Sequence, residues 1–393
     1  MSATTKKLIT KSLLEDGNSR FKVTYELTGS SYTSFQLIDE MTQDTKTFDQ
    51  FSTHYENLTI IDSIMSGIGR KPQTDFYQIV IKPVLNFSNI KHEYLKTESA
   101  DSIETFAKRL KTNQNYTIIF LSGDTSISEL VNNLPVLIDE TTKIRKFIKI
   151  VPIAMGSANA LANSIGLGNP IETFDNFLHG MKRTTAFPLY KVIFPNEKQI
   201  IFFIIFSMGF HANLLHLCTL DPKYSSLGVE RFQLASTEIL DNYDLNLKLE
   251  IKLAKKTIVS QFAYFALINT PNLEEKYIPS PQSDPFMSQL HILGYSSDLS
   301  PRQLTDNILN GYTLTRGDHV AGSGTVYESV TEDFDITIKT EIQKDPKYMM
   351  DVCCDGILEN LNDMTSEDLK IIKIKFLKPN DLAFNLEIMQ PEN

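Results

Sequence analysis

One short stretch of the chain joins an acidic residue to a small-residue turn at the start of a helix. The apolar run 116–121 is typical of a buried strand, and Ser122, Gly123 and Asp124 follow it. Backbone N–H groups and the helix dipole favour phosphate at such a turn. A carboxylate would repel a bare phosphate, so Asp124 suits a metal ligand or a base acting on a hydroxyl. The stretch therefore predicts phosphoryl transfer from a nucleotide, with a plain helix cap at Asp124 as the alternative.

Two further loops repeat the order of strand, small-residue turn and helix. One follows the β-branched run 58–62 and the other follows the apolar run 147–152. Their small and polar residues are Ser66, Gly67 and Gly69 in the first loop and Gly156, Ser157 and Asn159 in the second. Glycine lets a backbone approach a phosphate closely. Three such loops in order predict a parallel sheet with its ligand crevice at the carboxyl ends of the strands.

The pattern along the chain predicts three zones. Residues 1–57 are expected to form a β-rich N-terminal extension, because alternating runs flank a turn there. Residues 58–185 alternate strands and helices and should form an α/β nucleotide-binding domain with a parallel sheet. Strands dominate residues 186–393, which predicts an antiparallel β-sandwich domain. A chain of 393 residues is long enough for more than one domain.

Composition narrows the possible partners and compartments. The net charge of −10 argues against nucleic acid as a partner. The apolar run 200–206 is far short of the ~20 residues that a membrane-spanning helix needs. Three cysteines without metal-ligand spacing favour a reducing compartment. We therefore expect a cytoplasmic protein whose membrane contact, if any, is peripheral and transient.

Taken together, the motifs resemble those of the diacylglycerol kinase and sphingosine kinase superfamily of lipid kinases. That family's catalytic loop reads Gly-Gly-Asp-Gly-Thr with a Glu shortly after it, and residues 122–129 are similar. Residues 156–162 resemble the Gly-Ser-Gly-Asn-Ala-Leu-Ala of sphingosine kinases, and the loop at Ser66 resembles the family's Ser-Gly-x-Gly. The resemblance covers roughly residues 58–376 and suggests a divergent member closest to the sphingosine kinase branch.

The resemblance implies ATP-dependent phosphorylation of a lipid hydroxyl, with ATP and Mg²⁺ as cofactors. Asp124 would be the catalytic base and, with Asp355, would contact the metal. The residues implied for nucleotide binding are Ser66, Gly67, Gly69, Thr97, Ser122, Gly123, Thr125, Glu129, Gly156, Ser157, Asn159, Arg231, Asp355 and Gly356. Those implied for the lipid pocket are Phe206, Met208, Phe210 and His211.

Several departures from the family pattern keep other functions open. Thr125, Ala158 and Ile357 replace residues that are Gly, Gly and Glu in many members. A β-branched residue resists positive φ, so weak nucleotide binding or a non-catalytic regulator is an alternative. A soluble-substrate kinase similar to NAD kinase is another. Sphingosine kinases place an Asp that can pair with the lipid amine a few residues after a Gly-Phe, and the similar segment here, residues 211–218, contains no acid. The resemblance therefore implies a neutral lipid rather than a free sphingoid base.

Overall fold

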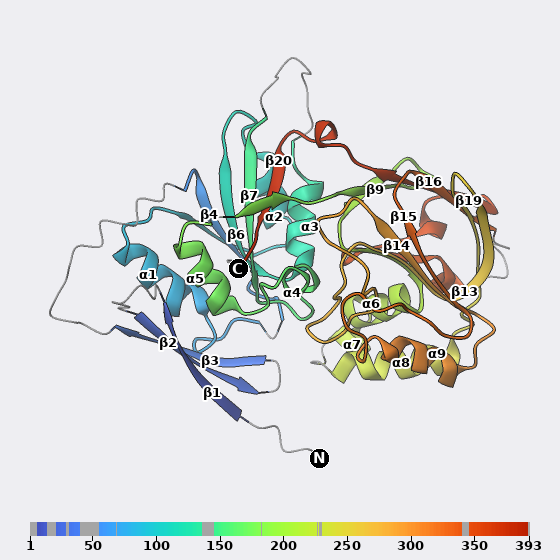
Figure 1. Ribbon diagram of the computed structural model, residues 1–393, viewed down its shortest axis with the longest axis horizontal. Helices are drawn as coiled ribbons and strands as arrows, with labels where there is room; N and C mark the ends of the chain where they lie inside the picture. Colours follow the sequence, from blue (N-terminus) through green and yellow to red (C-terminus); the bar gives the residue numbers. More distant parts are fainter. Residues whose placement is uncertain are drawn as a thin grey trace. The chain divides into compact units, whose positions relative to one another are not determined.

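The chain folds into two compact units, which are described separately. The computed structural model describes residues 6–13, 21–28, 31–39, 55–67, 69–135, 145–181, 183–225, 227, 230–339 and 346–391. The first unit comprises Met1–Ala186 together with Ala383–Asn393, and the second comprises Phe187–Leu382 (Figure 1).

The first unit is built around a six-stranded sheet in the order β5-β4-β6-β7-β20-β8. Its strands are β4 (Leu58–Asp62), β5 (Glu93–Lys96), β6 (Tyr116–Ser122), β7 (Phe147–Ala154), β8 (Thr184–Ala186) and β20 (Asn385–Met389). Neighbouring strands from β5 to β20 pair in parallel, whereas β8 pairs antiparallel with β20. Every residue of β4 and β6 is buried, which explains why both strands are continuous apolar or β-branched runs. The expected parallel sheet is confirmed.

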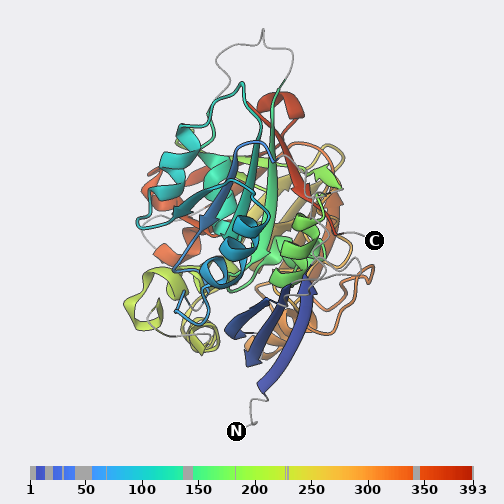
Figure 2. The same ribbon diagram turned by 90° about the vertical axis from the view of Figure 1, so that its left-hand side faces the viewer.

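Helices connect the parallel strands of this sheet. They are the π-helix η1 (Tyr77–Ile81), α1 (Lys82–Phe87), α2 (Ser102–Lys108), α3 (Asp124–Asn132), α4 (Ala160–Ser164) and α5 (Pro170–Leu178). Figure 2 turns this unit toward the viewer, with the blue α1 and the green α5 in front of the sheet. The start of α5 is fixed by Asn169, whose side chain accepts the backbone N–H groups of Ile171 and Glu172.

A small antiparallel sheet precedes the parallel sheet in the chain and belongs to the same first unit. It consists of β1 (Lys6–Leu13), β2 (Phe21–Thr28) and β3 (Ser31–Asp39). The ring of Phe35 lies 4.9 Å from that of Phe76, and the Phe35 N–H donates to the carbonyl of Gln73 at 2.9 Å. Phe21 makes an edge contact with Phe87. Strands therefore form part of the predicted extension, and their buried face joins the core of the first unit.

The second unit is built on a large antiparallel sheet of eleven strands. Its strands are β9 (Tyr190–Ile193), β10 (Gln199–Phe202), β11 (Ile205–Gly209), β12 (Leu247–Lys252), β13 (Thr257–Ile268), β14 (Leu290–Ser296), β15 (Thr325–Val330), β16 (Phe334–Lys339), β17 (Asp351–Cys354), β18 (Ile357–Asn360) and β19 (Leu369–Phe376). Alternate positions of these strands, such as Leu247, Leu249 and Ile251, point into one hydrophobic core. All of its strand pairs are antiparallel, which confirms the expected antiparallel β domain.

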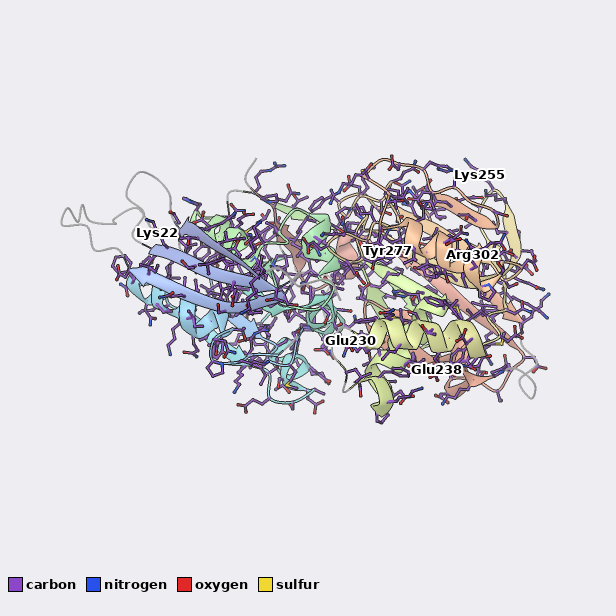
Figure 3. The ribbon with its side chains drawn as sticks, turned by 90° about the horizontal axis from the view of Figure 1, so that it is seen from below. Lys22, Glu230, Glu238, Lys255, Tyr277 and Arg302 are labelled. Carbon is purple, nitrogen blue, oxygen red and sulfur yellow. The ribbon has the colours of Figure 1, made fainter. Side chains whose placement is uncertain are left out.

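Short helices accompany this sheet. They are α6 (Phe210–Leu220), α7 (Pro222–Ser225), α8 (Glu230–Asn242), α9 (Pro301–Asn310) and the 3₁₀ helices η2 (Lys347–Met350), η3 (Leu361–Asp363) and η4 (Pro379–Asp381). Figure 3 labels Glu230 and Glu238, both on α8. None of the helices in the described ranges is long and apolar enough to cross a membrane.

The end of the chain departs from the expected domain boundary. The sequence pattern places all of residues 186–393 in the second domain, but β20 pairs in parallel with β7 of the first unit, matching Leu386 with Ile148. The physical reason is burial: Ile388 and Met389 are fully buried as part of that sheet. Residues 383–393 therefore belong to the first unit.

Candidate functional site

Three strand-to-helix loops meet at the carboxyl ends of β4, β6 and β7. The N–H of Gly123 donates to the side-chain oxygen of Ser66 at 3.2 Å, which links the first two loops. A Cβ built on Gly156 would lie 2.4 Å from the Cα of Gly123, and one on Gly67 would lie 2.8 Å from the carbonyl oxygen of Met155. Side chains cannot fit at these contacts, so the backbones approach each other directly. The structure thus brings together the loop residues that the sequence singled out.

Asp124 ties two of these loops together through its carboxylate. It is the first residue of α3, and its two oxygens accept the backbone N–H groups of Ala160 at 2.7 Å and Leu161 at 3.0 Å. Burial raises the pKa of the Asp124 carboxyl, while these N–H groups act in the opposite direction. The carboxylate therefore caps α4 rather than α3. Two of its roughly four lone-pair positions remain for other partners.

Asn159 shapes the loop after β7. Its side-chain oxygen accepts the N–H of Gly156 at 2.8 Å, and its amide donates to the Gly156 carbonyl at 3.0 Å. Asn159 adopts a left-handed backbone with φ of 53°, which Asn tolerates better than most residues. Ser157, between them, is exposed. Ala158 has no positive φ, so the missing glycine at this position causes no backbone strain.

Thr125 does not strain its loop, contrary to the expectation from the sequence. It lies in the first turn of α3 with helical backbone angles and an exposed side chain. A β-branched residue is tolerated in a helix with negative φ. The argument from backbone strain for weak nucleotide binding at Thr125 is therefore wrong. Whether Thr125 itself touches a nucleotide stays a prediction.

A buried ion pair supports the loop after β4. Asp62 ends that strand, and its carboxylate accepts the Nε–H of Arg70 at 2.9 Å and the hydroxyl of Tyr94 at 3.1 Å. The same guanidinium donates to the carbonyl oxygen of Leu121 at 2.6 Å. Both charged side chains are almost fully buried. Arg70 is thus engaged in holding β4, β5 and β6 together at the site.

Two other predicted residues of the first unit lie beside these loops. Thr97 follows β5, and its N–H donates to the Asp62 carbonyl at 3.0 Å. Glu129 lies on α3 and is half-buried, and desolvation raises the pKa of its carboxyl. No hydrogen bond or ion pair joins that carboxylate to another residue in the described ranges. The Glu129 carboxylate therefore makes no contact of this kind that would hold the described fold together. Gly69 closes the first loop by donating its N–H to the Ser66 carbonyl.

The remaining predicted nucleotide residues lie in the second unit. The Asp355 carboxylate accepts the backbone N–H groups of Phe203, Ile204 and Ile205 at 2.7, 3.0 and 2.7 Å. It therefore fixes the turn between β10 and β11, and Gly356 follows it with φ of 92°. Their assignment to the nucleotide stays a prediction.

Arg231 and the predicted lipid-pocket residues also belong to the second unit. Arg231 lies on α8 with its guanidinium over the ring of Phe232, and its Nε is buried without a partner among the described residues. Phe206 and Met208 belong to the hydrophobic core. The remaining two predicted pocket residues, Phe210 and His211, begin α6. Only His211 of these pocket residues is more than marginally exposed.

The two expected metal ligands, Asp124 and Asp355, belong to different units of the chain. No cluster of three or more His, Cys, Asp or Glu side chains suited to a metal occurs within the described ranges. The carboxylates of Asp124 and Asp355 both accept backbone N–H groups instead. Magnesium is often held by one or two carboxylates together with substrate phosphates and water. The assignment of Asp124 and Asp355 to a metal therefore stays a prediction.

A comparison with known protein families finds a similar domain that contains all three loops. A model of the diacylglycerol kinase catalytic domain matches residues 66–187, which contain the loops at Ser66, Asp124 and Gly156. Residues 66–187 are therefore similar to a diacylglycerol kinase catalytic domain. The match supports the diacylglycerol kinase and lipid kinase superfamily, while the sphingosine kinase branch stays a prediction. No curated protein matches the chain.

Solved structures extend the likeness beyond the catalytic domain. A crystal structure of a diacylglycerol kinase from Bacillus anthracis strain Sterne has 14% sequence identity and a TM-score of 0.56. The match covers 86% of this chain and 98% of that one. A second crystal structure from the same strain gives the same identity and coverage with a TM-score of 0.58. At this identity the likeness establishes the fold.

Proposed function

We propose that this protein is an ATP-dependent lipid kinase that phosphorylates the hydroxyl of a neutral lipid. The observation that supports the proposal best is the meeting of three glycine-containing loops at the carboxyl ends of parallel strands. Gly67, Gly123 and Gly156 let the backbones of the three loops pack directly against one another at the helix starts, where nucleotide phosphates are commonly bound. The match of residues 66–187 to a diacylglycerol kinase catalytic domain supports this reaction class.

Asp124 is the proposed base in this reaction. A raised pKa makes a carboxylate a better acceptor for the proton of a hydroxyl near neutral pH. Its bonds to Ala160 and Leu161 hold the carboxylate in one orientation. The Mg²⁺ that the family uses would be held chiefly by nucleotide phosphates and water, with Glu129 as the uncommitted carboxylate nearest in sequence.

A non-catalytic nucleotide- or lipid-binding regulator is the second candidate. Asp124 and Asp355 both accept backbone N–H groups, a structural role that would account for both residues without any chemistry. Phosphoryl-transfer activity is therefore the first property to measure.

The test uses the full chain with γ-labelled ATP. The acceptors are diacylglycerol, monoacylglycerol, ceramide and sphingosine in mixed micelles, with NAD as a soluble acceptor. We expect label in a neutral lipid above the level in sphingosine. Label in NAD alone would replace the lipid kinase with a soluble-substrate kinase. No label in any acceptor, together with measurable ATP binding, would favour the regulator.

A further inference from the structure

The outward side of the antiparallel sheet in the second unit carries mostly lysine at its charged positions. Strands β10, β9, β19, β16, β12 and β13 are neighbours in that order. Alternate residues of these strands, such as Leu249, Ile336 and Ile374, point into the core, so the residues between them point outward. The outward charged residues are Lys191, Lys248, Lys252, Lys339, Lys373, Lys375, Glu250 and Asp335. We call this outward side of the six strands the basic face.

The strand register brings these lysines onto one surface from distant parts of the chain. Lys373 on β19 is the register partner of Asp335 on β16, which in turn pairs with Lys252 on β12. Lys375 on β19 pairs with Lys191 on β9. Neighbouring strands lie about 4.8 Å apart, so the six strands together span roughly 25 Å. The basic face is therefore a product of the fold, and no local run of positive charge in the sequence marks it.

Most of these lysines are not neutralised by an acid. Lys252 lies 3.4 Å from the Glu250 carboxylate, and Lys375 lies 3.0 Å from the carboxylate of Asp333. The other four form no ion pair with any residue that the structure describes; they are Lys191, Lys248, Lys339 and Lys373. The chain as a whole carries a net charge of −10. The basic face is thus positive on an acidic protein, and its local field attracts an anionic surface that the rest of the chain repels.

Exposed aliphatic side chains stand among the lysines of the basic face. Val259 on β13 is 74% exposed, and Leu369 and Ile371 on β19 are 45% and 41% exposed. Ile371 lies two residues from Lys373 and therefore on the same side of its strand. The solvated face of an antiparallel sheet is normally polar, so these aliphatics are unusual there. Lysine together with exposed aliphatic residues is typical of segments that lie in the interface of a membrane.

We propose that the basic face docks the second unit on a membrane surface that contains anionic phospholipids. The lysine ammonium groups pair with the anionic headgroups, while Val259, Leu369 and Ile371 enter the layer beneath them. Each lysine close to an anionic leaflet strengthens binding about fivefold. This docking needs neither a nucleotide nor an acceptor hydroxyl, so it goes beyond the proposed phosphoryl transfer and does not depend on it.

An acidic protein is the other class of partner with complementary charge, and the composition of the basic face fits it less well. The core of a protein interface is depleted in lysine and enriched in aromatic residues. The outward positions of the six strands hold six lysines and no aromatic residue. Isolated aliphatics such as Val259 among mobile lysine side chains suit a fluid lipid surface better than a fixed protein surface.

The test compares two charge reversals in the second unit that differ in their place. Lys248→Glu reverses a lysine of the basic face that has no ion pair, so the melting temperature should be unchanged while binding to anionic vesicles falls roughly twentyfold. Lys276→Glu makes the same change of charge at an exposed residue in the loop after β13 and should leave binding unchanged. Figure 3 shows Tyr277, the neighbour of Lys276, apart from Lys255 in the turn between β12 and β13. Val259→Ser should weaken binding without changing its salt dependence.

Binding is measured by co-sedimentation of the full chain, without ATP, with vesicles of phosphatidylcholine alone or mixed with phosphatidylserine. We expect wild type to bind the mixed vesicles at low ionic strength, to leave them at high ionic strength and to bind phosphatidylcholine alone weakly.

Three results would overturn the docking proposal. No binding to the mixed vesicles would leave an acidic protein as the partner that fits the basic face. Equal binding to both kinds of vesicle would remove the role of the lysines. Equal losses in Lys248→Glu and Lys276→Glu would assign binding to net charge rather than to this face. Vesicle binding by a chain that transfers no phosphate would leave the docking proposal standing and remove the kinase function instead.

Discussion

Gly123 and Gly156 come from different loops, yet a Cβ on Gly156 would stand 2.4 Å from the Cα of Gly123. The two residues lie in the turns after β6 and β7, which pair in parallel up to Ser122 and Ala154. Their contact holds the α3 and α4 starts together, with Asp124 bridging to Ala160. These two loops of the candidate site therefore pack so closely that no side-chain atom fits between their backbones at this contact.

Gly156→Ala should destabilise the first unit and weaken nucleotide binding. The new methyl group must push the two loops apart, which typically costs about 1–3 kcal/mol. Gly166→Ala is the matched control, because its Cβ would meet nothing closer than 3.5 Å and Gly166 is not among the predicted nucleotide-binding residues. That control should cost only the roughly 1–2 kcal/mol of a positive φ. Urea unfolding and calorimetric ATP titration measure both effects, and wild-type ATP affinity in folded Gly156→Ala would contradict the tight packing.

Asp124→Asn should lower stability as well as activity. An Asn side chain places an N–H₂ group against one of the two backbone N–H groups that the carboxylate now accepts. We expect a loss of about 1–2 kcal/mol in the free energy of unfolding, measured in urea. Glu129→Gln is the control, because that carboxylate has no bond to the rest of the described chain. Equal stability of Asp124→Asn and wild type would mean that the cap on α4 contributes nothing.

Thr125→Gly should not improve ATP binding. Thr125 already has helical backbone angles at the start of α3, so glycine relieves no strain. The substitution should instead cost roughly 0.5 kcal/mol of stability, because glycine is a poor helix former. Calorimetric titration with ATP decides the point. A tenfold gain in affinity would show that the loop needs a conformation that Thr125 prevents.

The stability of the second unit should fall in mild acid. His291 is buried beside the Ser283 hydroxyl at 2.9 Å, and desolvation lowers its pKa to about 4. Below pH ~6.5 the His291 imidazole of the unfolded chain therefore binds a proton. The same imidazole in the folded chain stays neutral until the pH approaches 4. The contribution of His291 is therefore complete above pH ~6.5 and lost as the pH falls toward 4, by roughly 3 kcal/mol in all. Urea unfolding between pH 7 and 4.5 should show this slope, and His291→Gln should reduce it; an equal slope in the variant would assign the effect elsewhere.

The loops of the site were predictable from the sequence because each one carries its own local signal. A buried strand, a turn of small residues and a helical pattern lie within about 15 residues of one another at Ser66, Asp124 and Gly156. The catalytic domain match over residues 66–187 supports the same reading.

Other features depend on residues far apart in the chain, and no local pattern marks them. The pairing of β20 with β7 joins Leu386 to Ile148. The carboxylate of Asp355 accepts the N–H of Phe203, more than a hundred residues away. Thr125 was misjudged because a family glycine suggested positive φ where this chain already begins a helix. Tertiary packing decided the first two outcomes, and the local start of α3 decided the third.

The most direct test of the lipid kinase function is phosphoryl transfer by wild type and Asp124→Asn under conditions in which both are folded. The assay follows label from ATP into diacylglycerol or monoacylglycerol, and ATP binding is titrated in parallel. The proposed mechanism predicts transfer by wild type and a loss of about 10²–10⁴-fold in Asp124→Asn, with ATP still bound. Wild-type turnover by a folded Asp124→Asn would contradict the role of Asp124 as the base, and no transfer by wild type to any lipid hydroxyl would contradict the kinase itself.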